Sequence, residues 1–305
     1  MIEFYRNSIK DTKLKKIDKF LAGCWINVYA PTKQEIDYLV EEFNLDKDNL
    51  LSGLDQHEIP RADFIDGVTY IYIKAPFGKR VFSVKTLLIV ISDKFILTLS
   101  DHSPEYLKDI ISQKLRVNII TTQRKKFLLH VLNINNKEIE KKTLEIVKSI
   151  ETKKRITKEL KEKDINEMIE HEYSLNILAS VYSYTNYMYS KIIHRMGFFE
   201  KDKDILEELM IATEEGEHLC KTSLKNISNI RNYSMVLLSM KLNKLISVLT
   251  VFTVFLSVIA SISSIYGMNI KLPFQNDSDA FLYIITIIAT IWLLIVWYLK
   301  RERIF

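Results

Sequence analysis

The residues Tyr266-Gly267-Met268-Asn269 stand where a long apolar run stops, shortly before Pro273. Gly267 is one of only seven glycines in the chain, and a glycine here lets the backbone leave a helix and expose carbonyl groups. Asn269 adds a neutral amide oxygen. Mg²⁺ keeps several of its waters when bound, and neutral oxygens can hold a hydrated ion without stripping it. A plain helix cap is the alternative interpretation of these residues.

Small polar side chains recur along the apolar run that precedes this motif. At 4-3 spacing the run carries Asn243, Ser247, Thr250, Ser257, Ser261 and Ser264, with Val254 in the one apolar slot. This spacing places them on one face of a helix. Helix packing through small residues is one interpretation, and the wall of a pore is another that is compatible with it. One stripe cannot enclose water, so a pore predicts a symmetric homo-oligomer.

Two uncharged runs, 245–270 and 280–299, are long enough to cross a membrane. Each reaches the roughly 20 residues that a ~30 Å hydrocarbon layer requires. A pair of buried core helices is the alternative. Aromatic residues towards the ends of the second run, such as Tyr283 and Trp297, are typical of membrane interfaces. We predict a transmembrane domain over 245–305, with spans at about 246–267 and 280–299 and a basic cytoplasmic tail.

The distribution of basic residues predicts the orientation of these spans. Lys241 and Lys244 precede the first span and KRERIF follows the second, whereas the connecting segment holds one Lys and two Asp. The positive-inside rule then places both termini in the cytoplasm. The first 20 residues have no apolar core of a signal peptide. We therefore expect a multi-pass protein of the cell membrane, surrounded by lipid; the mild net charge of +5 does not call for a nucleic-acid partner.

The chain before Pro104 predicts a cytoplasmic α/β domain over 1–117. The segments CWINVYA, DGVTYIYIKA, VKTLLIVIS and KFILTLS are β-branched and aromatic at strand length. The segment TKQEIDYLVEEFNL predicts a helix with Thr32 as its cap and Glu35 three residues later. The overall fold class is thus an α+β membrane protein with long helices between this domain and the spans.

Residues 118–244 predict a long-helix region and stalk, because no proline lies between Pro104 and Pro273. Two helices are expected over about 120–197, with a turn near KELKEKD. A last helix begins near Asp202 and continues to Gly267, about 65 residues or roughly 100 Å. Its 4-3 seam consists of Ile205, Leu209, Ala212, Gly216, Leu219, Ser223, Asn226, Ile230, Tyr233, Leu237 and Met240.

Several function classes are excluded by the residues themselves. Neither span contains Asp, Glu, Lys, Arg or His, which excludes the usual intramembrane proton relays. No glycine-rich loop with a following lysine is present, so coupling to ATP is not expected. His57-Glu58 and His171-Glu172 lack the second histidine of a metalloprotease motif, and no enzyme is predicted. Cys24 and Cys220 are expected to be two separate thiols.

The Tyr266–Asn269 motif at the end of the first of two C-terminal spans resembles the signature of the CorA family of magnesium channels. The resemblance extends to the domain order and the basic tail, and more weakly to LDQHEIPRADFIDGVTYIYIKAP. It implies a funnel-shaped homopentamer whose five first spans line the pore, with Tyr266, Gly267, Met268 and Asn269 as selectivity filter and Asn269 facing the hydrated ion. The implied pore-lining positions are Asn243, Ile246, Leu249, Thr253, Ser257, Ala260 and Ser264.

The resemblance further implies gating by the cytoplasmic domain. Leu249 falls in the hydrophobic gate region, and Glu208 aligns with a regulatory metal ligand, so that Mg²⁺ is both the transported ion and a regulatory ligand. Co²⁺ and Ni²⁺ are further expected substrates, driven like Mg²⁺ by the membrane potential. Met268 favours the magnesium branch over a zinc-transporting branch. The zinc branch, and a membrane-tethered sensor or scaffold without transport, are the alternatives. Val258 and Ser264 depart from the family's common proline and glycine.

Overall fold

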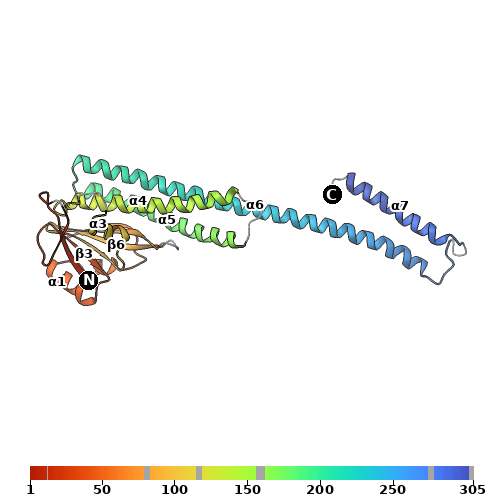
Figure 1. Cartoon of the computed structure of the whole chain (residues 1–305), viewed down its shortest axis with the longest axis horizontal. Coiled ribbons are helices and arrows are strands. Elements are labelled where there is room, and N and C mark those ends of the chain that lie inside the picture. Colours follow the sequence, from red (N-terminus) through yellow and green to blue (C-terminus); the bar gives the residue numbers. More distant parts are fainter. Residues whose placement is uncertain (12, 79–82, 115–118, 156–161, 274–277, 302–305) are drawn as a thin grey trace. The chain divides into compact units, whose positions relative to one another are not determined.

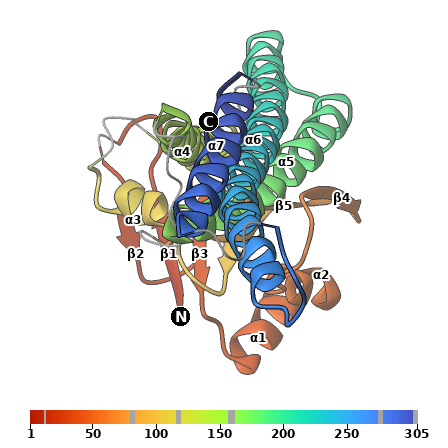
Figure 2. The same cartoon turned by 90° about the vertical axis from the view of Figure 1, so that its right-hand side faces the viewer.

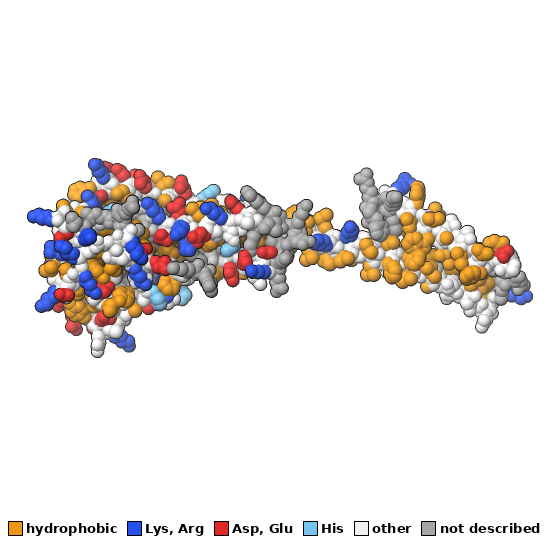
Figure 3. Space-filling view, in the orientation of Figure 1, with side chains coloured by type: hydrophobic (Ala, Val, Ile, Leu, Met, Phe, Trp, Pro, Cys, Tyr) orange, Lys and Arg blue, Asp and Glu red, His pale blue; other side chains and the backbone are white. Residues whose placement is uncertain are grey.

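The computed structural model describes the chain except residues 12, 79–82, 115–118, 156–161, 274–277 and 302–305. The chain forms two compact units, Met1–Ile230 and Arg231–Phe305. Figure 1 labels the elements of both. Charged side chains are spread over the surface of the first unit, whereas hydrophobic side chains dominate the surface of the second (Figure 3). This contrast is what a water-facing unit and a lipid-facing unit require.

Within the described residues, the first unit contains a seven-stranded sheet in the order β2-β1-β3-β7-β6-β5-β4. The strands are β1 Ile2–Arg6, β2 Lys15–Ile17, β3 Cys24–Tyr29, β4 Arg61–Ile65, β5 Val68–Phe77, β6 Ser83–Ile91 and β7 Phe95–Ser100. The pair β3–β7 is parallel and the other pairs are antiparallel. The four predicted strands are confirmed as β3, β5, β6 and β7, while the sequence prediction missed β1, β2 and β4.

Three short helices accompany the sheet: α1 Lys33–Phe43, α2 Lys47–Ser52 and α3 Glu105–Ile111. The predicted start of α1 is confirmed by a capping box. The Thr32 hydroxyl accepts from the Glu35 backbone N–H at 3.2 Å, and the Glu35 carboxylate accepts from the Thr32 N–H at 2.8 Å. That second bond is the main reason why the pKa of Glu35 lies below its ordinary value.

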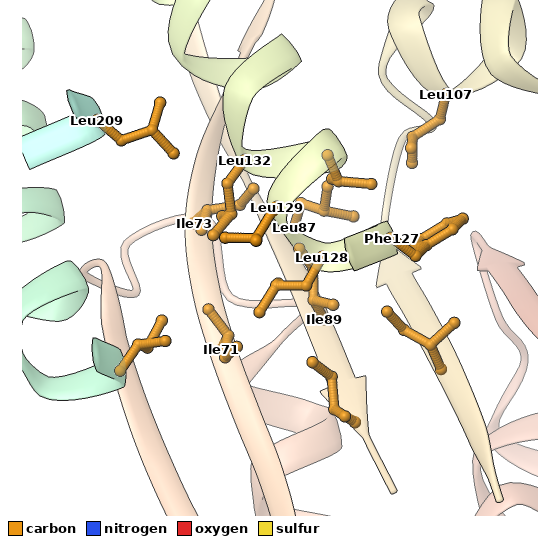
Figure 4. Close-up of a cluster of buried hydrophobic side chains, with 14 of the residues drawn as sticks. Ile71, Ile73, Leu87, Ile89, Leu107, Phe127, Leu128, Leu129, Leu132 and Leu209 are labelled. Carbon is orange, nitrogen blue, oxygen red and sulfur yellow. The ribbon is translucent and has the colours of Figure 1, made fainter. Parts of the chain in front are cut away.

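The two faces of the sheet pack against different helices, because side chains of a strand alternate between faces. Cys24, Ile26 and Val28 of β3 pack with Leu39 of α1 and Leu50 of α2. The other face packs against α4, as Figure 4 shows for Phe127, Leu128, Leu129 and Leu132 above Ile71, Ile73, Leu87 and Ile89. These side chains are buried, and they fix the beginning of α4 on the sheet.

Three long helices complete the chain's first unit: α4 Arg124–Arg155, α5 Glu162–Arg195 and the beginning of α6 Glu200–Tyr266. These three helices run side by side in both views of the molecule (Figure 1 and Figure 2). The two predicted helices and the single last helix are confirmed; α6 has 67 residues and begins two residues before Asp202. Of the predicted turn KELKEKD, residues 158–161 lie outside the described residues, and Glu162 already begins α5.

The seam along the first part of α6 has the predicted 4-3 spacing, but four of its eight predicted members up to Ile230 are wrong. Its predicted continuation at Tyr233, Leu237 and Met240 is not buried. The buried residues are Asp202, Leu206, Leu209, Thr213, Gly216, Cys220, Ser223, Ile227 and Ile230. The prediction therefore missed every second position by one residue, choosing Ile205 in place of Leu206. The position of the neighbouring helix α5 determines which residues of α6 are buried. An added Cβ at Gly216 would come within 2.4 Å of the Tyr182 ring of α5, so α5 lies directly against this face.

The second unit consists of the part of α6 from Arg231 onward and of α7 Ala280–Arg301. The ring of Phe255 meets the ring of Trp292 edge-on, with centroids 4.4 Å apart. Within the described residues, α6 is the one helix that is long and apolar enough to cross a membrane, and none of its apolar window is buried. The described apolar part of α7, Phe281–Trp297, is shorter.

Candidate ion pathway

One face of α6 in the second unit is covered, and α7 is the helix that covers it. Half-buried side chains recur at Ser247, Val251, Phe255, Val258 and Ile262, a run of steps of three and four residues. Such steps define a single helix face. Phe255 lies in the middle of that face, in contact with Trp292 of α7. The other faces of this part of α6 have no neighbour among the described residues.

The predicted pore-lining residues lie on the side of α6 opposite Phe255. At 100° per residue, Ser257 and Ser264 point away from the face that α7 covers. The structure leaves all seven exposed: Asn243, Ile246, Leu249, Thr253, Ser257, Ala260 and Ser264. A single copy thus presents this set as one open face and does not enclose a passage with it.

The hydroxyl groups on and beside this face are hydrogen-bonded within the helix. Ser247 donates to the carbonyl of Asn243 at 2.9 Å, and Thr250 donates to that of Ile246 at 2.8 Å. Thr253 donates to the Leu249 carbonyl and Ser257 to the Thr253 carbonyl, both at 2.8 Å. Each bond reaches back four residues, the usual way in which Ser and Thr satisfy themselves in an apolar helix.

The helix ends at the predicted filter motif. The Gly267 N–H donates to the Ser263 carbonyl at 3.0 Å, and the Met268 N–H donates to the Ile265 carbonyl at 3.2 Å. Tyr266, Gly267, Met268 and Asn269 are all exposed. The Tyr266 hydroxyl donates to the Pro273 carbonyl at 3.4 Å, which ties the end of the helix to the segment after it.

Gly267 ends α6 without the left-handed conformation that is common for glycine at the end of a helix. The described residues with positive φ include Gly23, Gly67, Gly78 and Gly197 but not Gly267. A Cβ added there would meet the Ser263 carbonyl oxygen at 3.4 Å, close to ordinary contact. The backbone of one copy therefore does not by itself require a glycine at this position.

The predicted regulatory residue Glu208 lies exposed on the first part of α6. Among the described residues, no group of three or more His, Cys, Asp or Glu side chains is placed to hold a metal ion. Glu208 is thus not brought together with other ligands inside one copy. The two thiols are free and buried, as expected from their distance in the sequence.

An ionic cluster in the first unit was not singled out by the sequence prediction, although it lies in the segment LDQHEIPRADFIDGVTYIYIKAP. Arg61 pairs with Glu58 at 3.0 Å and with Asp63, and its guanidinium lies 4.2 Å from the centre of the Tyr72 ring. Lys191 of α5 lies 3.7 Å from the Asp63 carboxylate. The cluster joins β4 to β5 and to α5, so its role is to hold the helices on the sheet.

Comparison with known proteins finds similarity along nearly the whole chain. The sequence pattern described as CorA-like Mg2+ transporter protein matches residues 21–301. The cobalt/magnesium transport protein CorA of Methanocaldococcus jannaschii is 25% identical over 296 residues, covering 91% of this chain and 90% of that protein.

Two solved structures give the same result for the fold. The complete structure of the CorA magnesium transporter from M. jannaschii matches with a TM-score of 0.85 at 20% identity, covering 99% of this chain and 98% of that chain. The structure of the full-length CmaX protein matches with a TM-score of 0.77 at 13% identity, covering 99% and 97%.

Proposed function

We propose that the chain, which belongs to the CorA-like Mg²⁺ transporter family, conducts Mg²⁺ through a homopentameric membrane pore. The members of this family are divalent-cation transporters and not enzymes. Co²⁺ and Ni²⁺ are further proposed substrates. The proposed location is the cell membrane, with two spans and both termini in the cytoplasm. The ion moves down its gradient and the membrane potential, which supplies about 4.6 kcal/mol per 100 mV for a divalent cation.

The observation that carries this proposal is the open face of α6. α7 covers the face centred on Phe255, and the opposite face carries all seven proposed pore residues in an exposed state. In a membrane, an exposed stripe that includes Asn243, Thr253 and Ser257 is better satisfied by water or by other copies than by lipid. Five copies around one axis would turn these stripes into a closed wall.

The proposed filter acts by holding a hydrated ion. Five copies of Asn269 would form a ring of neutral amide oxygens at the outer mouth, where they accept hydrogen bonds from the ion's waters. Because Mg²⁺ gives up its waters reluctantly, such outer contacts can select an ion without trapping it. Gly267, whose missing side chain one copy does not need, would let neighbouring chains approach closely around that ring.

The proposed gate lies further along the same face. Ile246 and Leu249 are exposed apolar residues on the pore side of α6. A ring of such side chains can close a pore by excluding water, without any block of the passage by charge. We propose that the cytoplasmic unit controls this ring through Mg²⁺ bound between copies, with Glu208, an exposed carboxylate of α6, as one ligand.

The test is ion uptake by vesicles that contain the purified full-length protein. We expect Asn269→Ala to lower Mg²⁺ flux at least tenfold, because the ring of amide oxygens is lost. Asn229→Ala, at an exposed position on the first part of α6, is the matched control and should leave flux unchanged. Parental flux in Asn269→Ala would overturn the filter assignment.

The same vesicles decide the substrate. Flux of Mg²⁺, Co²⁺, Ni²⁺ and Zn²⁺ is compared at several Mg²⁺ concentrations on the cytoplasmic side. A preference for Zn²⁺ would favour the zinc-transporting branch, and no flux of any ion would favour a tethered sensor or scaffold. Crosslinking in membranes provides the second measurement, since a monomer or dimer would contradict the pentameric pore.

A further inference from the structure

A cavity of about 670 Å³ opens in the first unit, away from the proposed pore. It lies where the turns of the hairpins β4–β5 and β6–β7 meet the start of α4, the end of α5 and the start of α6. Five chain segments thus contribute to one hollow, of which only the end of α5 and the start of α6 are neighbours in the sequence. The family signature and the pore residues are not part of it.

Four cationic side chains line this cavity: Arg124, Lys125, Lys126 and Arg195. No carboxylate in the described part of the chain lies within ion-pairing distance of any of them. Lys125 donates to the Gly197 carbonyl at 2.8 Å, which ties the start of α4 to the loop between α5 and α6. The Arg195 guanidinium lies 5.8 Å from the centre of the Phe64 ring. A concave surface with this charge attracts anions.

The carboxylates in the cavity do not cancel this charge. Two acidic residues, Asp93 and Asp202, belong to its lining. Asp202 is buried in the first turn of α6, where the helix's own N-terminal N–H groups stabilise a negative charge. The first turn of α4 is the reverse case, since it begins with Arg124-Lys125-Lys126 and contains no acidic residue. An anion in the cavity would therefore meet both the basic side chains and the positive end of α4.

The walls of the cavity also offer aromatic surface. Phe199, between α5 and α6, is 80% exposed, and Phe64 lies at the end of β4. An apolar ring that is left this exposed beside a basic hollow provides a stacking surface for a planar group. The volume is larger than an inorganic phosphate needs. The combination of phosphate-binding charge and stacking surface is that of a nucleotide site.

We propose that this cavity binds a nucleotide, with its phosphates on Arg124, Lys125, Lys126 and Arg195 and its base against Phe199. This site is separate from the ion pathway and does not depend on the ion that the protein transports. It gives the cytoplasmic unit a second ligand besides a divalent cation.

The first experiment measures binding of ATP to the purified full-length protein by titration calorimetry, in the absence of divalent ions. We expect saturable binding that weakens as NaCl is raised, because charge supplies most of the affinity. Arg124→Glu with Lys126→Glu should weaken binding more than tenfold. Lys137→Glu with Lys141→Glu makes the same change of charge at two exposed positions further along α4 and should bind as the parent does. Equal loss in both double variants, or no ATP binding to the parent, would overturn the proposal.

The second experiment separates the base from the phosphates. Phe199→Ala should weaken ATP binding about fivefold and leave inorganic phosphate binding unchanged, whereas Tyr187→Ala, at another highly exposed ring, should change neither. Both rings are largely exposed, so neither variant is expected to unfold the protein. If inorganic phosphate binds the parent as tightly as ATP, the aromatic part of the proposal is wrong. Ion flux is not used as a readout, so failure here leaves the proposed transport untouched.

Discussion

The part of α6 that ends at Ile230 and the part that follows it are one continuous helix with opposite surroundings. From Asp202 to Ile230, nine residues at 4-3 spacing are buried against the first unit. From Arg231 to Tyr266 no described residue is buried, although this part is the more apolar. Burial along α6 therefore follows the presence of neighbouring helices and not the hydrophobicity of the side chains. The apolar surface of the second part is of the kind that a membrane-spanning helix presents to lipid.

A leucine pair would test this difference most strongly. Leu206 in the first part is fully buried, whereas Leu242 in the second part is 50% exposed. We expect Leu206→Ala to lower the free energy of unfolding of the first unit by about 2–5 kcal/mol, because it leaves a cavity in the core. Leu242→Ala should change it by less than about 0.5 kcal/mol. Denaturant unfolding in detergent, followed by hydrogen exchange of the α4 and α5 amides, measures both. Similar losses for the two variants would contradict the comparison.

A glycine substitution gives a smaller effect at the same seam. Alanine at Gly216 places its Cβ within 2.4 Å of the Tyr182 ring, whose hydroxyl is held by Thr143 at 3.0 Å. We expect a loss of about 1–2 kcal/mol, since overpacking outweighs the gain of about 1 kcal/mol in helix propensity. Thr222→Ala, at an exposed position in the same helix, is the control. Tyr182→Leu should restore most of the loss in the double variant, and a failure to do so would show that the ring is not the cause.

Thiol chemistry tests burial in the first part of α6 through the pH dependence of stability. Cys220 is fully buried, and burial raises the pKa of its thiol from 9.0 to about 12. The unfolded chain loses this proton above about pH 9 and the folded protein keeps it, so the free energy of unfolding falls as the pH rises from 9 towards 12. We expect this slope to be shallower in Cys220→Ser, measured by denaturant unfolding between pH 8 and 11.

The same comparison can be made by labelling at pH 8. A cysteine introduced at the exposed Ser257 of the second part should react with a small methanethiosulfonate reagent at least a hundredfold faster than Cys220. Fast labelling of Cys220 in the folded protein would contradict its burial.

The sequence predicts those elements whose signal lies within their own residues. The capping box at Thr32 and Glu35, the four β-branched strands and the uninterrupted α6 all follow from local patterns. β2 and β4 were missed because they are short and carry charged residues such as Lys15 and Arg61, and their backbones become strands by pairing with β1 and β5. In α6, Ile205 and Leu206 are equally suitable for the seam, and the position of α5 alone selects Leu206.

Only part of the candidate site, too, could be predicted from the sequence. The 4-3 spacing predicts that Asn243, Ser247, Thr250, Ser257, Ser261 and Ser264 share one face. The structure leaves five of these residues exposed and places Ser247 on the half-buried face that α7 covers. The filter and the regulatory site stay predictions, because both require atoms from several copies. The basic cavity has no signal in the sequence, since Phe64, Arg124, Arg195 and Phe199 come from separate segments that only the fold brings together.

The hydrogen bonds that the α6 hydroxyls make to the backbone also determine whether these hydroxyls can donate or accept further hydrogen bonds. Ser247, Thr250, Thr253 and Ser257 each give their one hydrogen to a carbonyl four residues earlier. What remains on the outside of each oxygen is a pair of lone pairs, which can accept but no longer donate. On the open face, where Thr253 and Ser257 lie, these oxygens are electronegative without carrying a formal charge. These oxygens favour the hydrogens of water around a cation, whereas the amide group of Asn243 on the same face can still donate.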